Sequence, residues 1–286
     1  MHPLAPLLRT ALNTTSRIAP RLSGRLAFAA FVRPLGRSRV RPAERALLDR
    51  ARLGTLRLRG RNVVTYTWGD GARPVLLVHG WSSRSSRFSA FITALCDQGY
   101  SPVTFDAPGH GDSEGRASNL RDYREIIGRL HAEHGDFEAV VAHSFGVLAS
   151  FVALHDGVVA HRFVGIGGVA EFDHLLDAFR TRLGLHERVE RDIRGHVERV
   201  LFPGEPAIWE RLTATYRPER LPAPVLLLHD EDDDMTPVAQ SRLAAAALGD
   251  RARLVLTKGL GHRRILADPD VVARAVDFVV TADARP

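Results

Sequence analysis

Short, mostly apolar runs recur along this chain and constrain its fold more than any other feature. They occupy residues 74–79, 102–105, 139–142, 163–166, 225–228 and 253–256. Segments with helical spacing lie between or after them, at 86–97, 120–134, 146–155, 238–247 and 269–281. A continuous apolar run is typical of a parallel strand that is covered on both faces. Because strands and helices alternate, the pattern predicts an α/β fold with a doubly wound, mostly parallel sheet.

Two further segments, 55–59 and 62–68, alternate in the way of antiparallel strands and precede this pattern. One interval breaks the rhythm, because residues between 166 and 225 have helical spacing and no strand pattern. We expect an all-helical insertion at about 169–222, which leaves from the functional edge of the sheet and forms a lid. Four of its apolar residues are predicted to line a substrate pocket: Phe172, Leu176, Phe179 and Trp209.

The first 52 residues differ from the rest in charge. They hold eleven arginines against Glu44 and Asp49, a net charge of +9, whereas the remainder carries −3. Leucine or isoleucine recurs about every four residues, which indicates amphipathic helix with a break at Pro20. We therefore expect a basic, helical N-terminal extension over 1–52. Packing against the rest of the chain is its expected role, and weak contact with a membrane surface is the alternative.

Composition excludes several other classes. Beyond residue 52 the basic residues are spread out, so we expect no nucleic-acid partner. No run of 18 apolar residues exists to span a membrane, and no secretory signal is clear, so a cytoplasmic protein is expected. The single cysteine, Cys96, excludes an internal disulfide and a thiolate metal cluster.

The third run ends in Ala142-His143-Ser144-Phe145-Gly146 and is followed at once by a helical segment. A serine on such a tight strand-to-helix turn has its Oγ exposed above the sheet, as in a nucleophile elbow. Ala142 stands where glycine is usual. Ser144 is the predicted nucleophile.

Two glycine-containing turns follow the first two parallel strands. His79-Gly80-Trp81 lies where a second oxyanion donor is needed, so the backbone N–H groups of Trp81 and Phe145 are the predicted oxyanion hole. The turn at 106–113 is interpreted as structural, with Asp106 and Asp112 bonded to the backbone.

A serine nucleophile needs a base and an acid downstream. His262 follows the last apolar run in a glycine-containing loop and is the predicted base, while His229 is expected to be a packed polar residue. The acid is expected among five consecutive acidic residues at 230–234, and Asp173 is a more distant rival. Asp230 and Asp232 are close alternatives.

Together, these ordered motifs resemble the α/β-hydrolase superfamily over about residues 60–282, and in particular a group of small bacterial serine hydrolases of esterase type. In members with this acidic turn the acid stands four residues before the proline, which implies Asp233 here. The resemblance implies an α/β-hydrolase domain over 53–286 and hydrolysis of a carboxylic ester or related acyl bond through a covalent acyl-enzyme. The expected partner is a small acyl substrate, and no cofactor or metal is expected. The alternatives are an aminopeptidase, a carbon–carbon bond hydrolase and a non-catalytic binding protein on the same fold.

Overall fold

The structure, a computed structural model, describes residues 5–205, 207–221 and 223–281. The contacts within it divide the chain into two compact units. The helical unit combines the N-terminal residues up to 33 with residues 171–213, and the sheet unit comprises 34–170 and the residues from 214 onward. Among the described residues, no helix is long and apolar enough to cross a membrane.

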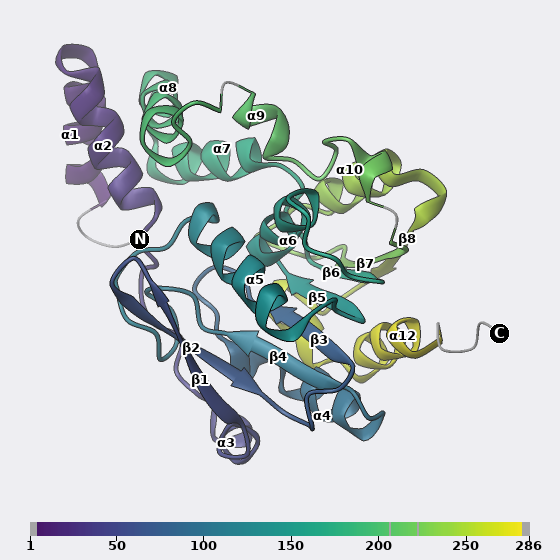
Figure 1. Cartoon of the computed structure of the whole chain (residues 1–286). Helices are drawn as coiled ribbons and strands as arrows, with labels where there is room; N and C mark the ends of the chain where they lie inside the picture. Colours follow the sequence, from purple (N-terminus) through teal and green to yellow (C-terminus); the bar gives the residue numbers. More distant parts are fainter. Residues whose placement is uncertain (1–4, 206, 222, 282–286) are drawn as a thin grey trace. The chain divides into compact units, whose positions relative to one another are not determined.

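The sheet unit is built on eight strands in the order β1-β2-β4-β3-β5-β6-β7-β8 (Figure 1). The strands are β1 Arg52–Leu58, β2 Arg61–Thr67, β3 Pro74–Val78, β4 Ser101–Phe105, β5 Ala139–His143, β6 Phe163–Ile166, β7 Val225–Asp230 and β8 Ala252–Thr257. β2 is antiparallel to both β1 and β4, and every other pair is parallel. The predicted α/β fold with a mostly parallel sheet is therefore confirmed.

Helices cover both faces of this sheet, with α4 and α12 on one face and α5, α6 and α10 on the other (Figure 1). Their bounds are α4 Ser89–Asp97, α5 Leu120–His134, α6 Phe145–His155, α10 Val238–Leu248 and α12 Pro269–Val280. Every residue of β3, β4, β5, β6 and β7 is buried. Burial on both faces explains why these strands read as continuous apolar runs.

Local signals set where these helices begin. The Asn119 side chain accepts a hydrogen bond from the backbone N–H of Asp122, and the Asp122 carboxylate accepts one from the backbone N–H of Asn119, which forms a capping box at the start of α5. At the start of α12 the Asp268 side chain accepts a hydrogen bond from the N–H of Val271, and Pro269 occupies the first helical position. The carboxyl ends of the parallel strands, where the site lies, are thus framed by well-defined helix starts.

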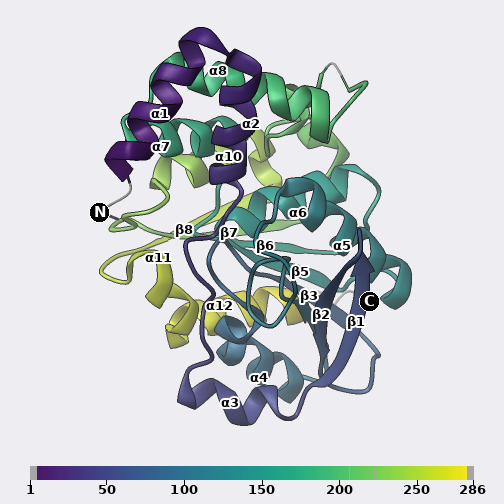
Figure 2. The ribbon, with the colours of Figure 1, turned by 90° about the vertical axis from the view of Figure 1, so that its left-hand side faces the viewer.

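The helical unit contains α1 and α2 from the N-terminal segment and α7 and α8 from the insertion (Figure 2), together with α9 (Figure 1). Their bounds are α1 Ala5–Ile18, α2 Pro20–Phe31, α7 Phe172–Leu183, α8 Glu187–His196 and α9 Ile208–Arg211. The break at Pro20 lies between α1 and α2, where proline occupies the first position of α2. An isolated antiparallel bridge between Glu171 and Thr213 joins the two ends of the insertion.

α2 and α8 pack closely at Gly24. A Cβ atom on Gly24 would lie 2.2 Å from the backbone oxygen of Asp192, so only glycine allows this approach. Ser16 adds a hydrogen bond of 2.5 Å from its Oγ to Oδ2 of Asp192. The N-terminal segment expected over 1–52 is shared between the units, because α3 (Pro42–Leu48) belongs to the sheet unit. There Glu44 is buried and accepts a hydrogen bond from Ser86 Oγ at 2.7 Å.

Candidate active site

Ser144 lies on the sharp turn between β5 and α6. Its φ is 56° and its ψ is −124°, a left-handed conformation that is strained for a residue with a side chain. The turn is held by a hydrogen bond of 3.0 Å from the Ser144 N–H to the backbone oxygen of Ile166, and one of 3.0 Å from the Val147 N–H to the backbone oxygen of Ser144. This geometry is the one that presents a serine Oγ at the carboxyl edge of a sheet.

Small residues let strand and helix approach each other around this turn. A Cβ atom on Gly146 would lie 2.5 Å from the backbone oxygen of Val78 in the neighbouring strand. Ala142, which departs from the usual glycine, is a paired residue of β5 between Val78 and Gly165 and is fully buried. The additional methyl group is therefore accommodated within the sheet.

His262 lies in the short helix α11 (Gly261–Arg264), and its Nε2 is 3.0 Å from Ser144 Oγ. The loop that carries it is fixed by Asp230, whose carboxylate accepts hydrogen bonds from the backbone N–H groups of Leu260 at 3.1 Å and Gly261 at 2.8 Å. Asp232 accepts another from the N–H of Gly259 at 3.0 Å. Two of the acidic residues thus hold the histidine loop in place.

Asp233 is the member of the acidic run that meets the imidazole. Its Oδ2 is 2.7 Å from His262 Nδ1, while its Oδ1 accepts hydrogen bonds from the backbone N–H groups of Met235 at 2.9 Å and Thr236 at 2.8 Å. The structure therefore brings Ser144, His262 and Asp233 into one hydrogen-bonded chain. The distant rival, Asp173, lies in the first turn of α7 and is ion-paired with Arg194.

The charge state of Asp233 determines which nitrogen of His262 carries the proton. Burial raises the pKa of Asp233, but hydrogen bonds from His229, His262 and the backbone of Thr236 outweigh it, so the net pKa is lowered. The carboxylate is consequently ionised near neutral pH and can only accept. His262 must then carry its proton on Nδ1, which leaves the Nε2 lone pair directed at the hydroxyl of Ser144, as a general base requires.

His229 is packed against this acid, as expected of a buried polar residue. Its Nδ1 is 2.6 Å from Ser241 Oγ, its Nε2 is 2.9 Å from the backbone oxygen of Thr236, and Nε2 is also 3.4 Å from Asp233 Oδ2. Within the described part of the chain, no group of three His, Cys, Asp or Glu side chains is placed to hold a metal ion.

The His79-Gly80-Trp81 turn lies directly against the serine. A Cβ atom on Gly80 would be 2.7 Å from Ser144 Cβ, and the rings of Trp81 and Phe145 meet edge to face with centroids 5.6 Å apart. From within the described residues, no hydrogen bond is formed to the backbone N–H of Trp81 or of Phe145. Both amides, beside the serine, are thus unpaired donors.

His143 contacts the loop of His262, and the sequence analysis did not single it out. It is buried, and its Nε2 is 2.9 Å from the backbone oxygen of His262, while the two imidazole rings lie 4.7 Å apart. Burial, together with the proximity of His262, lowers the pKa of His143 to about 3, so the ring is neutral. Its position directly before the serine was the one available signal.

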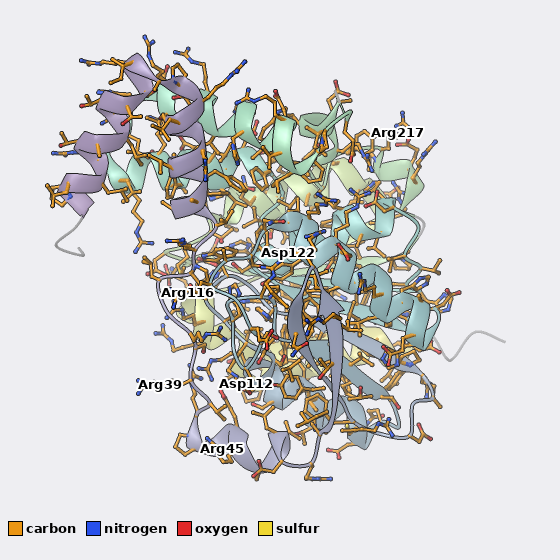
Figure 3. All side chains as sticks on the ribbon, turned by 60° about the vertical axis from the view of Figure 1, so that its left-hand side comes forward. Arg39, Arg45, Asp112, Arg116, Asp122 and Arg217 are labelled. Carbon is orange, nitrogen blue, oxygen red and sulfur yellow. The ribbon has the colours of Figure 1, made fainter. Side chains whose placement is uncertain are left out.

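The turn at 106–113 is a structural network, as interpreted, with one difference. Asp106 is fully buried and its carboxylate accepts hydrogen bonds from the backbone N–H groups of Ser85 and Asp112, both at 2.8 Å. Asp112, labelled in Figure 3, bonds instead to side chains: Tyr66 OH at 2.8 Å and Arg84 Nη2 at 2.5 Å. Two carboxylates can share Arg84 because its guanidinium offers several donors in a plane.

The four predicted pocket residues all lie in the helical unit. The ring of Phe172 packs against Trp209, with centroids 5.8 Å apart, and Leu176 is buried. Phe172 and Phe179 both contact Phe31 of α2, at 5.8 and 5.3 Å between centroids. The structure thus gathers these residues around an aromatic ring from the N-terminal segment. That they line an acyl pocket stays a prediction.

Comparisons with known proteins match this geometry to a family. The model of the alpha/beta hydrolase family matches residues 75–275. A non-heme haloperoxidase of Rhodococcus erythropolis is 24% identical in an alignment of 263 positions that covers 74% of this chain and 93% of the relative.

Two solved structures have the same fold. The monoacylglycerol lipase of Paleococcus ferrophilus aligns with a TM-score of 0.59 at 24% identity, over 77% of this chain and 98% of the other. A meta-cleavage product hydrolase from Pseudomonas fluorescens aligns with a TM-score of 0.57 at 22% identity, over 80% and 98%. With the family model matching more than half of its length, the chain belongs to the alpha/beta hydrolase family.

Proposed function

We propose that this chain is a serine hydrolase that cleaves a carboxylic ester or related acyl bond. Ser144 is the nucleophile, His262 the general base and Asp233 the acid that orients the imidazole. The observation that carries this proposal is the hydrogen-bonded chain from Ser144 Oγ to His262 Nε2 at 3.0 Å and from His262 Nδ1 to Asp233 Oδ2 at 2.7 Å. That arrangement can activate a hydroxyl that is otherwise a weak nucleophile.

The proposed reaction has two halves. Ser144 Oγ attacks the acyl carbon while its proton passes to His262 Nε2, and the backbone N–H groups of Trp81 and Phe145 bind the oxyanion. His262 then gives this proton to the leaving group, which departs and leaves an acyl-enzyme. In the second half water attacks the acyl carbon, again losing its proton to His262, and Ser144 regains a proton as the carboxylic acid is released.

The identity of the scissile bond is the finer part of the proposal. An ester is proposed because the resemblance to serine hydrolases of esterase type implies it, whereas the serine, the base and the two amide donors by themselves could also cleave an amide. An aminopeptidase would need carboxylates to hold a substrate amine, and Asp173, one candidate, is engaged with Arg194. A non-catalytic binding protein on the same fold would carry the same residues without turnover.

Labelling with a fluorophosphonate separates catalysis from binding. We expect the label on Ser144 alone, identified by mass spectrometry, and no label on Ser144→Ala. Ser83→Ala, a serine in the neighbouring turn, is the matched control and should label like the wild type. Label on another serine, or an unlabelled wild type, would reject Ser144 as the nucleophile.

A series of p-nitrophenyl esters of increasing acyl length tests the substrate class. The four residues proposed to line the acyl pocket are Phe172, Leu176, Phe179 and Trp209. Each buried CH₂ contributes roughly 0.8 kcal/mol, so kcat/KM should rise with length until the pocket is filled. Alanine at these positions should shift that limit, and an unchanged profile would place the pocket elsewhere.

The cytoplasmic location also stays a proposal, which cell fractionation tests.

A further inference from the structure

The outward face of α2 carries an apolar stripe. Ile18 at the end of α1 is 81% exposed, and Leu22 and Leu26 of α2 are 48% and 46% exposed. They are four residues apart, so the two leucines lie on the same face of the helix. The opposite face of α2 is the one that packs within the helical unit, because its Ser23, Gly24, Ala27 and Phe28 are buried. The stripe has no such burial.

Arginines accompany this stripe in register. Arg17, Arg21 and Arg25 each immediately precede one of the three apolar residues, and all three are exposed. None of them forms a hydrogen bond or ion pair in the described part of the chain, and the sequence contains no acidic residue before Glu44. Figure 3 shows nitrogen-tipped side chains projecting from the outside of α1 and α2. The face therefore combines exposed apolar surface with three arginines that form no ion pair among the described residues, and one of them, Arg17, shares a surface cavity with Glu187 of α8.

These two properties together select the partner. A nucleic acid would engage the arginines but offer little to the leucines. A protein surface would cover the leucines, but it would pair the arginines only if it also carried carboxylates in register with Arg17, Arg21 and Arg25, and otherwise they would lose hydration without gaining a partner. The headgroup region of an anionic bilayer accommodates both, because apolar side chains enter the acyl boundary while arginines meet lipid phosphates.

We propose that the face formed by Arg17, Ile18, Arg21, Leu22, Arg25 and Leu26, here named the Arg–Leu stripe, docks this protein reversibly on an anionic membrane surface. Arg21 to Leu26 advance about 8 Å along α2, and Arg17 and Ile18 end α1 just before the non-helical Ala19, so the contact is short, peripheral and in the plane of the interface. The proposal does not depend on the reaction catalysed at Ser144, since it rests on residues outside the sheet unit.

Co-sedimentation of the full chain with vesicles tests the stripe. We expect binding to vesicles of equal parts phosphatidylglycerol and phosphatidylcholine and little binding to pure phosphatidylcholine. Binding to the anionic vesicles should weaken as salt rises from about 0.05 to about 0.5 M, because the Debye length shortens. Replacing Arg17, Arg21 and Arg25 together by glutamine should weaken binding by on the order of 10²-fold, since each arginine contributes a factor of about five. Replacing Ile18, Leu22 and Leu26 by serine should weaken binding even at low salt.

Matched controls separate the stripe from general charge and exposure. Replacing Arg45, Arg116 and Arg274 by glutamine removes the same charge from exposed positions in the sheet unit, where Figure 3 labels the first two. Leu35 and Leu53, at 87% and 67% exposure, serve as serine controls for apolar surface. The control variants should bind like the wild type, and circular dichroism together with ester turnover verifies folding.

One added tryptophan, beside the three native ones, serves as a probe if a triple variant fails to fold. Leu22→Trp should show a blue shift of emission with anionic vesicles, relative to the wild-type protein. The proposal is overturned if the wild type does not bind anionic vesicles at low salt, if the controls lose binding as much as the stripe variants, or if the probe shows no shift. It is equally overturned if light scattering shows a dimer that the stripe variants convert to monomer, because the occupant is then a second copy.

Discussion

The imidazole of His143 donates a hydrogen bond from Nε2 to the backbone carbonyl of His262, across 2.9 Å. A carbonyl oxygen can only accept, so the proton of the neutral His143 ring lies on Nε2. The residue directly before Ser144 therefore holds the loop that carries the proposed base. Serine and histidine are positioned relative to each other by this bond as well as by their own contact of 3.0 Å.

Removing the His143 bond should impair turnover more than stability of the fold. We expect His143→Ala to lower kcat on an activated ester by up to about 10²-fold, because a shift of about 1 Å in catalytic groups has such effects. KM should change little, since His143 is buried and its bond is to the backbone of the histidine loop. His143→Gln, which can donate from its amide, should recover part of kcat. Equal activity of the alanine variant and the wild type would show that the bond does not position His262.

Asparagine substitutions along the acidic run distinguish the catalytic acid from the residues that hold the loop. Asp233→Asn should lower kcat by up to about 10⁴-fold, because an amide favours the wrong imidazole tautomer. Asp234→Asn, at an exposed neighbour, is the control and should retain activity. Asp230→Asn should lower the melting temperature and cost kcat far less than Asp233→Asn, since Asp230 binds the amides of Leu260 and Gly261 and not the imidazole. A collapse of kcat in another variant, with Asp233→Asn unaffected, would reassign the acid.

A methyl group at Gly80 should displace the turn that carries the Trp81 amide. Its carbon would lie 2.7 Å from Ser144 Cβ and 3.0 Å from the backbone oxygen of His143, so the backbone must move. We expect Gly80→Ala to lower kcat by at least about tenfold. Gly128→Ala is the control, because nothing lies within 4 Å of its added atom. In helix α5 that change should raise stability by about 0.5–1 kcal/mol. Unimpaired turnover of Gly80→Ala would exclude a tight oxyanion site at this turn.

Buried histidines should make stability fall on mild acidification. Burial lowers the pKa of His79, and it lowers the pKa of both His110 and His143 to about 3. Because the unfolded value is about 6.5, their contribution is complete above that pH and is lost progressively as pH falls toward 3. Each can remove up to about 1.4 kcal/mol per pH unit from the free energy of unfolding. Urea titrations at pH 7.5, 6 and 5 measure this slope, which His110→Gln should reduce. A free energy that is constant over this range would contradict the expectation.

Metal removal should leave the proposed reaction intact. The proposed covalent route supplies nucleophile, base and oxyanion donors from the chain itself. After dialysis against EDTA, ester turnover should equal that of the untreated protein. Activity that is lost on dialysis and restored by a divalent ion would show that a metal is required.

The parts of the fold that depend on local pattern were predictable from the sequence. All six apolar runs coincide with strands, and Pro20 separates two helices. Burial on both faces marks β3 to β7 in the sequence, β8 is only partly buried, and the missing N–H of proline marks the helix break. Ser144 and His262 were also accessible, since each follows a strand at the carboxyl edge of the sheet. Asp233 was indicated by its distance from Pro237, which the resemblance supplied.

What could not be predicted depends on contacts between distant residues. Nothing in the sequence around His143 shows that it contacts the carbonyl of His262. Asp230 and Asp232 bind the histidine loop only because the loops after β7 and β8 lie side by side in the fold. The division of the N-terminal segment between two units was equally hidden. Gly24 reads as an ordinary helix-weakening residue until Asp192 is placed against it.

The packing of α2 against α8 also has a consequence for folding during synthesis. Residues 20–31 leave the ribosome long before residues 187–196, their packing partners, have been made. At 5–20 residues per second the delay is on the order of ten seconds. Throughout it, Phe28 and Phe31 lack His196, Phe172 and Phe179, the rings of the insertion that they contact in the folded protein. The N-terminal half of the helical unit therefore cannot complete its packing until α7 and α8 have been made.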